Sequence, residues 1–203
     1  MRKPLFVIFI SAFFFSSLFA QITIDNYCVS IGRIRTTHGS EPLYSNYQYA
    51  FYPELQIGGK LIVPYITWAV YWGYWTDGVT EPFPVADMPT YSNHTNILGM
   101  RIGYLPSVST PNGPLQIQVF GGFSHHFISQ QWIGGFGLSG DSGSDYKENM
   151  NTLDIGLSAS FPIFGQFRMK GEFQQYFPIS ADENIRYLYQ QAYKVGFIYQ
   201  LQK

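Results

Sequence analysis

The stretch FSHHFIS, residues 123–129, holds the residues with the most obvious capacity for chemistry, because two histidines lie between two serines. A histidine that removes a proton from a serine, with a carboxylate orienting the histidine, is the arrangement of many hydrolases. In an extended strand, Ser124 and His126 point to one face and His125 to the other. The two adjacent histidines therefore cannot chelate one metal ion together. We expect ordinary residues at the rim of a fold, and we predict neither an enzyme nor a metal or other cofactor.

Carboxylates in a glycine- and serine-rich stretch offer a second possible site. Asp141 and Asp145 are the first and last residues of the run DSGSD, whose oxygens could coordinate calcium. The stretch lacks the spacing and the final glutamate of an EF-hand loop. We therefore expect a solvated loop.

Composition narrows the class of protein. Aromatic residues make up 19% of the 203 residues and charged residues only 12%, about half the usual charged share of roughly 25%. The net charge of −1 gives no basic excess that would attract nucleic acid. A single cysteine, Cys28, excludes an internal disulfide. We expect β structure in contact with something other than water.

The first twenty residues have the pattern of an export signal. Arg2 and Lys3 precede the apolar run Leu5–Phe15, and the small residue Ala20 predicts cleavage before Gln21. The alternative is an uncleaved membrane anchor, but the apolar run is shorter than the ~20 residues that a spanning helix needs. We predict a signal peptide over residues 1–20 and one domain over residues 21–203.

Alternation of apolar and polar residues predicts eight strands in the mature chain. They are Ile24–Arg35, Ala50–Leu61, Tyr65–Thr76, Asn96–Leu105, Leu115–Phe127, Asn151–Phe161, Phe167–Phe177 and Ala192–Lys203. The connections alternate between short and long, and the longer ones are about Thr36–Tyr49, Asp77–Thr95, Ile128–Met150 and Pro178–Gln190. This pattern predicts an all-β fold, an eight-stranded antiparallel up-and-down barrel, whose closure removes exposed sheet edges.

The apolar face of these strands faces either a ligand inside a soluble barrel or lipid outside a membrane barrel. With the apolar face outside, the charged strand residues point into the lumen. They are Glu54, Lys60, Arg101, Asp154, Arg168, Lys170, Glu172 and Lys194. Tyrosine and tryptophan gather near the predicted strand ends, as in the girdles of membrane barrels. They are Tyr47, Tyr49, Tyr52, Tyr65, Trp72, Trp75, Tyr104, Tyr176 and Tyr199. These features favour a transmembrane β-barrel.

The last strand resembles the C-terminal assembly signal of bacterial outer-membrane β-barrel proteins. Lys194, Gly196, Tyr199 and Leu201 occupy its polar, glycine, aromatic and apolar positions, although Gln202 and Lys203 follow where that family usually ends on an aromatic residue. As a whole, the mature chain resembles small OmpA- and OmpX-type barrels in architecture and pattern. The resemblance implies a location in the bacterial outer membrane, contact with its lipid, and recognition by the barrel assembly machinery. It implies no activity.

The lumen of an eight-stranded barrel is about as wide as the side chains that fill it. We therefore expect Glu54, Arg101, Asp154, Arg168, Lys170, Glu172 and Lys194 to form an ion-paired plug, with Arg101 and Glu172 as the first pair.

The expected role is structural or surface-interactive, through the long loops, with an unknown extracellular partner and no nucleic acid. Two alternatives stay open: a secreted lipocalin-like barrel that binds a hydrophobic ligand, and a lipid A-modifying enzyme that uses Ser124 and His126.

Overall fold

The computed structural model describes residues 22–38, 47–61, 63, 65–78, 90–111, 113–134, 146–181 and 187–201. Eight long strands dominate this part of the chain. They are β1 (Asn26–His38), β2 (Tyr47–Lys60), β3 (Ile66–Gly78), β4 (Thr90–Tyr104), β6 (Leu115–Gly134), β7 (Tyr146–Phe164), β8 (Phe167–Ala181) and β9 (Tyr187–Gln200). A two-residue strand, β5 (Ser107–Val108), lies in the connection between β4 and β6. No helix among the described residues is long and apolar enough to cross a membrane.

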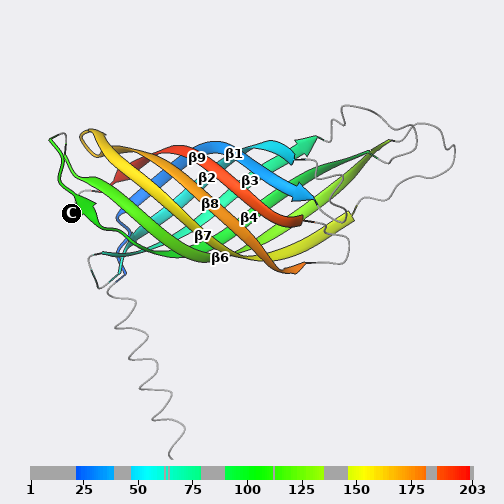
Figure 1. Cartoon of the computed structure of the whole chain (residues 1–203), viewed down its shortest axis with the longest axis horizontal. Coiled ribbons are helices and arrows are strands. Elements are labelled where there is room, and N and C mark those ends of the chain that lie inside the picture. The colour runs from blue at the N-terminus through cyan, green and yellow to red at the C-terminus, as the bar shows by residue number, and fades with distance from the viewer. Residues whose placement is uncertain are drawn as a thin grey trace, which may run out of the picture.

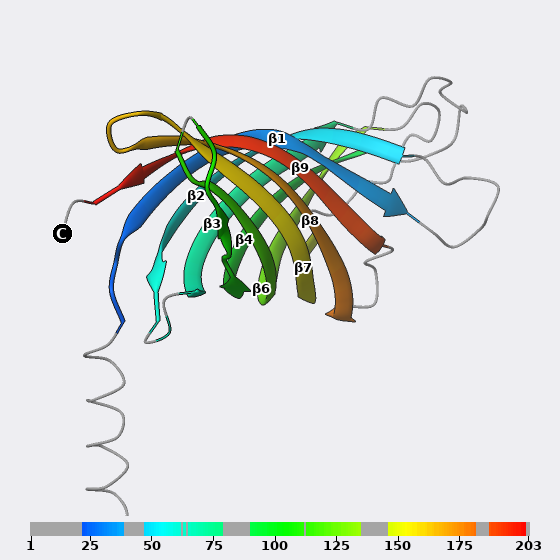
Figure 2. The same cartoon turned by 60° about the vertical axis from the view of Figure 1, so that its left-hand side comes forward.

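The eight long strands form one closed antiparallel barrel. Each pairs with its neighbour in the chain, β4 pairs directly with β6, and β1 pairs with β9 from Asn26↔Gln200 onward, which joins the first strand to the last. The strands run steeply tilted around a common axis (Figures 1 and 2). The predicted up-and-down barrel is confirmed.

The short connections gather at one end of the barrel, which we call the turn end. Residues 61–65 join β2 to β3, residues 105–114 join β4 to β6, and Gly165 and Gln166 join β7 to β8. Gly113 and Gly165 have φ angles of +103° and +51°, a region that favours glycine because it has no Cβ. At the opposite end, the loop end, the segments 39–46, 79–89, 135–145 and 182–186 fall outside the described residues, and so does the Asp141–Asp145 run.

All eight long strands continue farther toward the loop end than their sequence pattern predicts, and β4 and β6 do so by the most. β4 begins at Thr90 instead of Asn96, and β6 continues to Gly134 instead of Phe127. The two extensions pair with each other, with Tyr91 opposite Trp132. The sequences of these extensions do not alternate in polarity. Pairing continues there all the same, because backbone hydrogen bonds between strands do not require an apolar face.

The apolar face of the sheet points outward. Large apolar side chains on every long strand are between 36% and 66% exposed, among them Ile31, Leu55, Val70, Met100, Val119, Ile155, Phe177 and Val195. The buried side chains that face the lumen include most of the chain's charged strand residues. This is the opposite of what a soluble barrel with an apolar ligand cavity requires, so the lipocalin-like alternative has no support in the structure.

Three of the nine aromatic residues assigned to a girdle lie in the lumen instead. Tyr52, Trp75 and Tyr176 are completely buried there. Each shares the alternation phase of an inward residue on its own strand, and that phase overrides a position near a strand end. Four others, Tyr65, Trp72, Tyr104 and Tyr199, are exposed as expected, whereas the side chains of Tyr47 and Tyr49 fall outside the described part.

Candidate functional site: the luminal network

An ion-pair cluster occupies the middle of the lumen. Glu172 on β8 lies 2.7 Å from Arg101 and 2.5 Å from both Lys170 and Lys194. Glu54 on β2 lies 2.5 Å from Lys194 and 3.4 Å from Arg101. All five side chains are at most 3% exposed. Three cations thus share two carboxylates, and the pairs link strands β2, β4, β8 and β9 across the barrel.

Two amides complete the hydrogen bonding of this cluster. The side-chain oxygen of Gln56 accepts from Arg101 Nη2 and from Lys170 Nζ, the latter at 2.9 Å. The oxygen of Gln174 accepts from Lys194 Nζ at 2.7 Å and from Arg101 Nη1 at 3.4 Å. The plug predicted from the sequence does not include these glutamines. Their alternation could have identified them, because each lies two residues from a luminal glutamate.

Asp154 on β7 lies in a different, uncharged environment. Its Oδ2 accepts from Tyr71 at 2.5 Å, and its Oδ1 accepts from Thr152 at 2.6 Å and from Ser124 at 3.1 Å. Gln174 Nε2 also donates to Oδ2 at 3.4 Å, which connects this group to the ion-pair cluster. Hydroxyl and amide donors satisfy this carboxylate, and no ion pair to it occurs among the described residues.

Arg168 is buried at the turn end, apart from the cluster. Its Nη2 donates to the carbonyl oxygens of Pro114 at 2.6 Å and Ser160 at 2.9 Å. The guanidinium therefore ties β8 to β7 and to the connection that precedes β6. Of the seven residues predicted for the plug, five meet in the cluster, and Asp154 and Arg168 have other partners.

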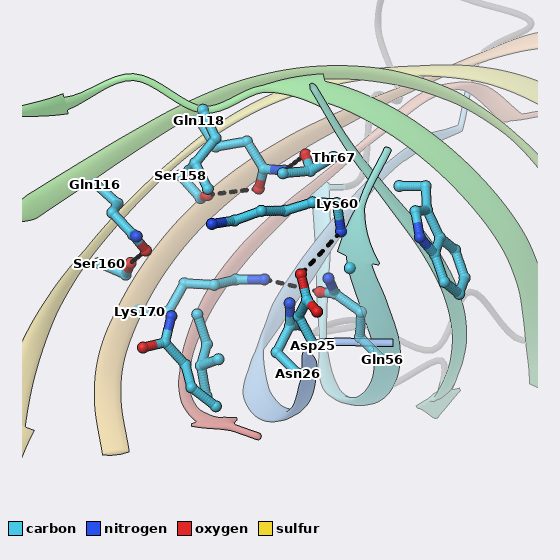
Figure 3. Close-up of a pocket in the computed structure, with 15 residues that line it drawn as sticks. Asp25, Asn26, Gln56, Lys60, Thr67, Gln116, Gln118, Ser158, Ser160 and Lys170 are labelled. Atoms are coloured by element: carbon cyan, nitrogen blue, oxygen red, sulfur yellow. Dashed lines mark hydrogen bonds between the residues drawn. The ribbon is translucent and has the colours of Figure 1, made fainter. Parts of the chain in front are cut away.

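A small cavity of about 70 Å³ lies at the turn end, and most of the residues that line it are polar (Figure 3). Lys60 and Lys170 lie on its wall, and Gln118 joins Thr67 and Ser158 through hydrogen bonds of 2.7 and 3.2 Å. Lys60 is exposed at this mouth and does not join the cluster. The cavity has room for a few water molecules.

Ser124 and His126 do lie side by side, but in an arrangement unsuited to hydrolysis. Ser124 Oγ is 3.1 Å from His126 Nε2. Asp154 contacts the serine and not the histidine, whose Nδ1 has no hydrogen-bond partner among the described residues. A triad needs the carboxylate on that nitrogen. His126 is also completely buried, so the predicted place at the rim is wrong for it.

His125 faces outward, as its alternation predicts. Its Nδ1 lies 2.8 Å from Asn151 Oδ1, and its ring packs edge-on against Phe127. The two adjacent histidines therefore point to opposite faces of the sheet. In the part of the chain that the structure describes, no group of three or more histidine, cysteine or acidic residues could hold a metal ion.

An apolar and aromatic layer fills the lumen on the loop side of the cluster. Its members are Ile34, Ala50, Tyr52, Tyr71, Trp75, Ile97, Ile128, Met150, Tyr176 and Ala192. Two of the tyrosine rings lie over glycines of the next strand, because a Cβ at Gly73 would overlap Tyr52 and one at Gly99 would overlap Tyr71. The missing side chains make room for the rings. The plug predicted from the sequence contains only charged residues, so it does not include this layer.

The residues assigned to the C-terminal assembly signal have varied surroundings. Lys194 belongs to the ion-pair cluster, and Gly196 packs closely against Ser30 of β1. Tyr199 is exposed on the outer face, and its ring lies 5.2 Å from that of Phe167. Leu201 follows β9, and its backbone N–H donates to the carbonyl oxygen of Asp25 at 2.8 Å. This geometry seats the last strand against the first.

Comparison with known proteins gives similarity at the level of structure. No protein-family model matches the chain, and no curated protein matches it. Neisserial surface protein A matches with a TM-score of 0.62 and 10% identity, over 87% of this chain and 97% of that protein. The attachment invasion locus protein Ail of Yersinia pestis matches with a TM-score of 0.54 and 10% identity, over 88% of this chain and 100% of that protein.

A major outer membrane protein from Thermus thermophilus matches with a TM-score of 0.54 and 12% identity, over 86% of this chain and 99% of that protein. At such identities the likeness concerns the fold alone. The chain therefore has the fold of the small eight-stranded barrels of bacterial outer membranes, as its sequence pattern predicts.

Proposed function

We propose that this protein is a bacterial outer-membrane barrel with a plugged lumen and a structural or surface-interaction role. The observation that carries the proposal is the inverted distribution of polarity. Apolar side chains cover the outside of all eight long strands, while Glu54, Arg101, Glu172 and Lys194 are buried inside. An apolar band around a closed barrel suits lipid, and so large a patch in water would cause association.

The plug is supported by three successive layers of luminal side chains. The polar groups around the cavity lie at the turn end, the ion-pair cluster occupies the middle, and the apolar and aromatic layer follows toward the loop end. Eight strands enclose an interior just wide enough for such side chains. With Ser124 and His126 enclosed in this interior, we propose no catalytic role.

We also propose how the chain is exported and assembled, and where a partner binds. Residues 1–20 would direct export and be removed near Ala20, and the β9 strand would be recognised by the barrel assembly machinery. The longer connections would then face the outside of the cell, where an extracellular partner would bind.

Measurements of ionic current across planar bilayers test the plug. We expect the purified, refolded chain to insert without opening a steady ion channel, because the proposed plug would leave no continuous water path. A refolded wide porin in the same bilayers is the positive control. Stable, reproducible open-channel currents from the correctly folded protein would contradict the plug.

A further inference from the structure

One strand places positive charge on the outer, apolar face. Along β1 the outward positions are Tyr27, Val29, Ile31, Arg33 and Arg35, and they alternate with buried or half-buried inward residues. Tyr27, Val29 and Ile31 are between 43% and 56% exposed, and Arg33 is exposed as well. The lipid-facing side of β1 thus passes from apolar side chains to two arginines.

These arginines are exceptional on the outer face. Among the described strand residues, the charged side chains that alternation places outside are Arg33, Arg35 and Lys147. No carboxylate shares that face within the described strands, so nothing on the outer surface there neutralises Arg33. Its register partners are Phe51 on β2 and Tyr193 on β9, which are 62% and 49% exposed.

Arg33 lies in the part of the apolar band that is nearer the loop end. Six residues separate Tyr27 from Arg33, which is a rise of roughly 15 Å along the axis for a strand tilted by ~40°, in a band ~25 Å tall. Arg35 lies opposite Gln191, where the outward face of β9 also becomes polar. A long arginine side chain at Arg33 can extend its guanidinium to this boundary.

We propose that Arg33 binds the phosphate group of an anionic lipid headgroup in the leaflet at the loop end. The site rests on the proposed location in a membrane. The exposed Arg33 guanidinium can donate two parallel hydrogen bonds to a phosphate. The neighbouring rings of Phe51 and Tyr193 would contact the acyl chains of the same lipid, which favours a lipid phosphate over a free one.

Native mass spectrometry of the refolded barrel tests the site. The protein is released from vesicles that contain equal amounts of phosphatidylglycerol and phosphatidylcholine, and the two retained lipids are counted. We expect the wild type to retain phosphatidylglycerol preferentially. Arg33→Gln should lower that preference roughly fivefold, the effect of one basic residue near an anionic surface. Arg33→Lys should keep part of it, and Lys147→Gln, which removes an outward charge on β7, should leave it unchanged.

The outcomes separate this site from the proposed function. A wild type that inserts and folds but retains both lipids equally, or an Arg33→Gln variant that folds and keeps the full preference, overturns the headgroup site alone. Displacement of the lipid by inorganic phosphate shows that a free anion is the ligand and overturns the lipid assignment. A wild type that does not insert into these vesicles contradicts the membrane location itself.

Discussion

Replacing Glu172 by glutamine should destabilise the barrel by about 3–5 kcal/mol, the cost of removing one partner from a buried ion pair. Glu172 pairs with Arg101, Lys170 and Lys194, so its loss leaves three buried cations with the single carboxylate of Glu54. The free energy of unfolding can be measured by urea titration of the protein in vesicles, followed by tryptophan fluorescence.

Glu148 provides a matched control for this substitution. It also faces the lumen and is 5% exposed, but its carboxylate has no hydrogen-bond partner among the described residues. Glu148→Gln should therefore be neutral or slightly stabilising. Adding Lys170→Met to Glu172→Gln should recover part of the loss, because it removes one surplus cation. Equal stabilities of the Glu172→Gln and Glu148→Gln variants would contradict the ion-pair cluster as an energetic unit.

Replacing Tyr71 by alanine should lower the free energy of unfolding by a similar amount, about 3–5 kcal/mol, because removing a large buried side chain leaves a cavity. The ring of Tyr71 fills the space over Gly99, and the Arg101 guanidinium carbon lies 5.1 Å from its centroid. Its hydroxyl donates to Asp154 at 2.5 Å and accepts from Gln174 at 3.0 Å. The residue therefore joins the ion-pair cluster to the Asp154 group, and the same urea titration measures its contribution.

Two variants divide the effect of Tyr71 into its parts. Tyr71→Phe removes only the hydroxyl and should cost about 1–3 kcal/mol, since Asp154 loses a buried donor. Tyr65→Ala removes an exposed tyrosine at the turn end and should change stability by less than about 1 kcal/mol. A Tyr71→Ala protein as stable as the Tyr65→Ala protein would show that the luminal aromatic residues are loosely packed.

Alternation of polarity determined how far the fold could be predicted. It fixed the number of strands and the face that each presents, because a shift by one residue would move Ile31 or Val195 into the lumen and Glu54 or Lys194 into the apolar band. It placed every strand end at the loop end too early, most of all in β4 and β6, where pairing continues without an apolar face. The phase of the alternation places Tyr52, Trp75 and Tyr176 in the lumen. Their positions near strand ends suggested the girdle instead.

Partner choice inside the lumen could not be predicted from the strand sequences. Arg101 lies opposite Ala69 on β3 and Gly122 on β6 in the hydrogen-bond register, yet its guanidinium reaches Glu54 and Glu172 on strands farther around the barrel. Such contacts depend on the tilt and stagger of the closed sheet. The contacts between side chains across the lumen can therefore be identified only from the three-dimensional structure of the barrel.

Electrophoresis of the envelope fraction, with and without boiling, tests the central claim most directly. Closed membrane barrels resist cold detergent and change their mobility on heating. We predict that the full chain sediments with the outer membrane and shows this shift. A protein that is recovered in soluble form, with one mobility before and after boiling, would contradict the account of a lipid-embedded barrel.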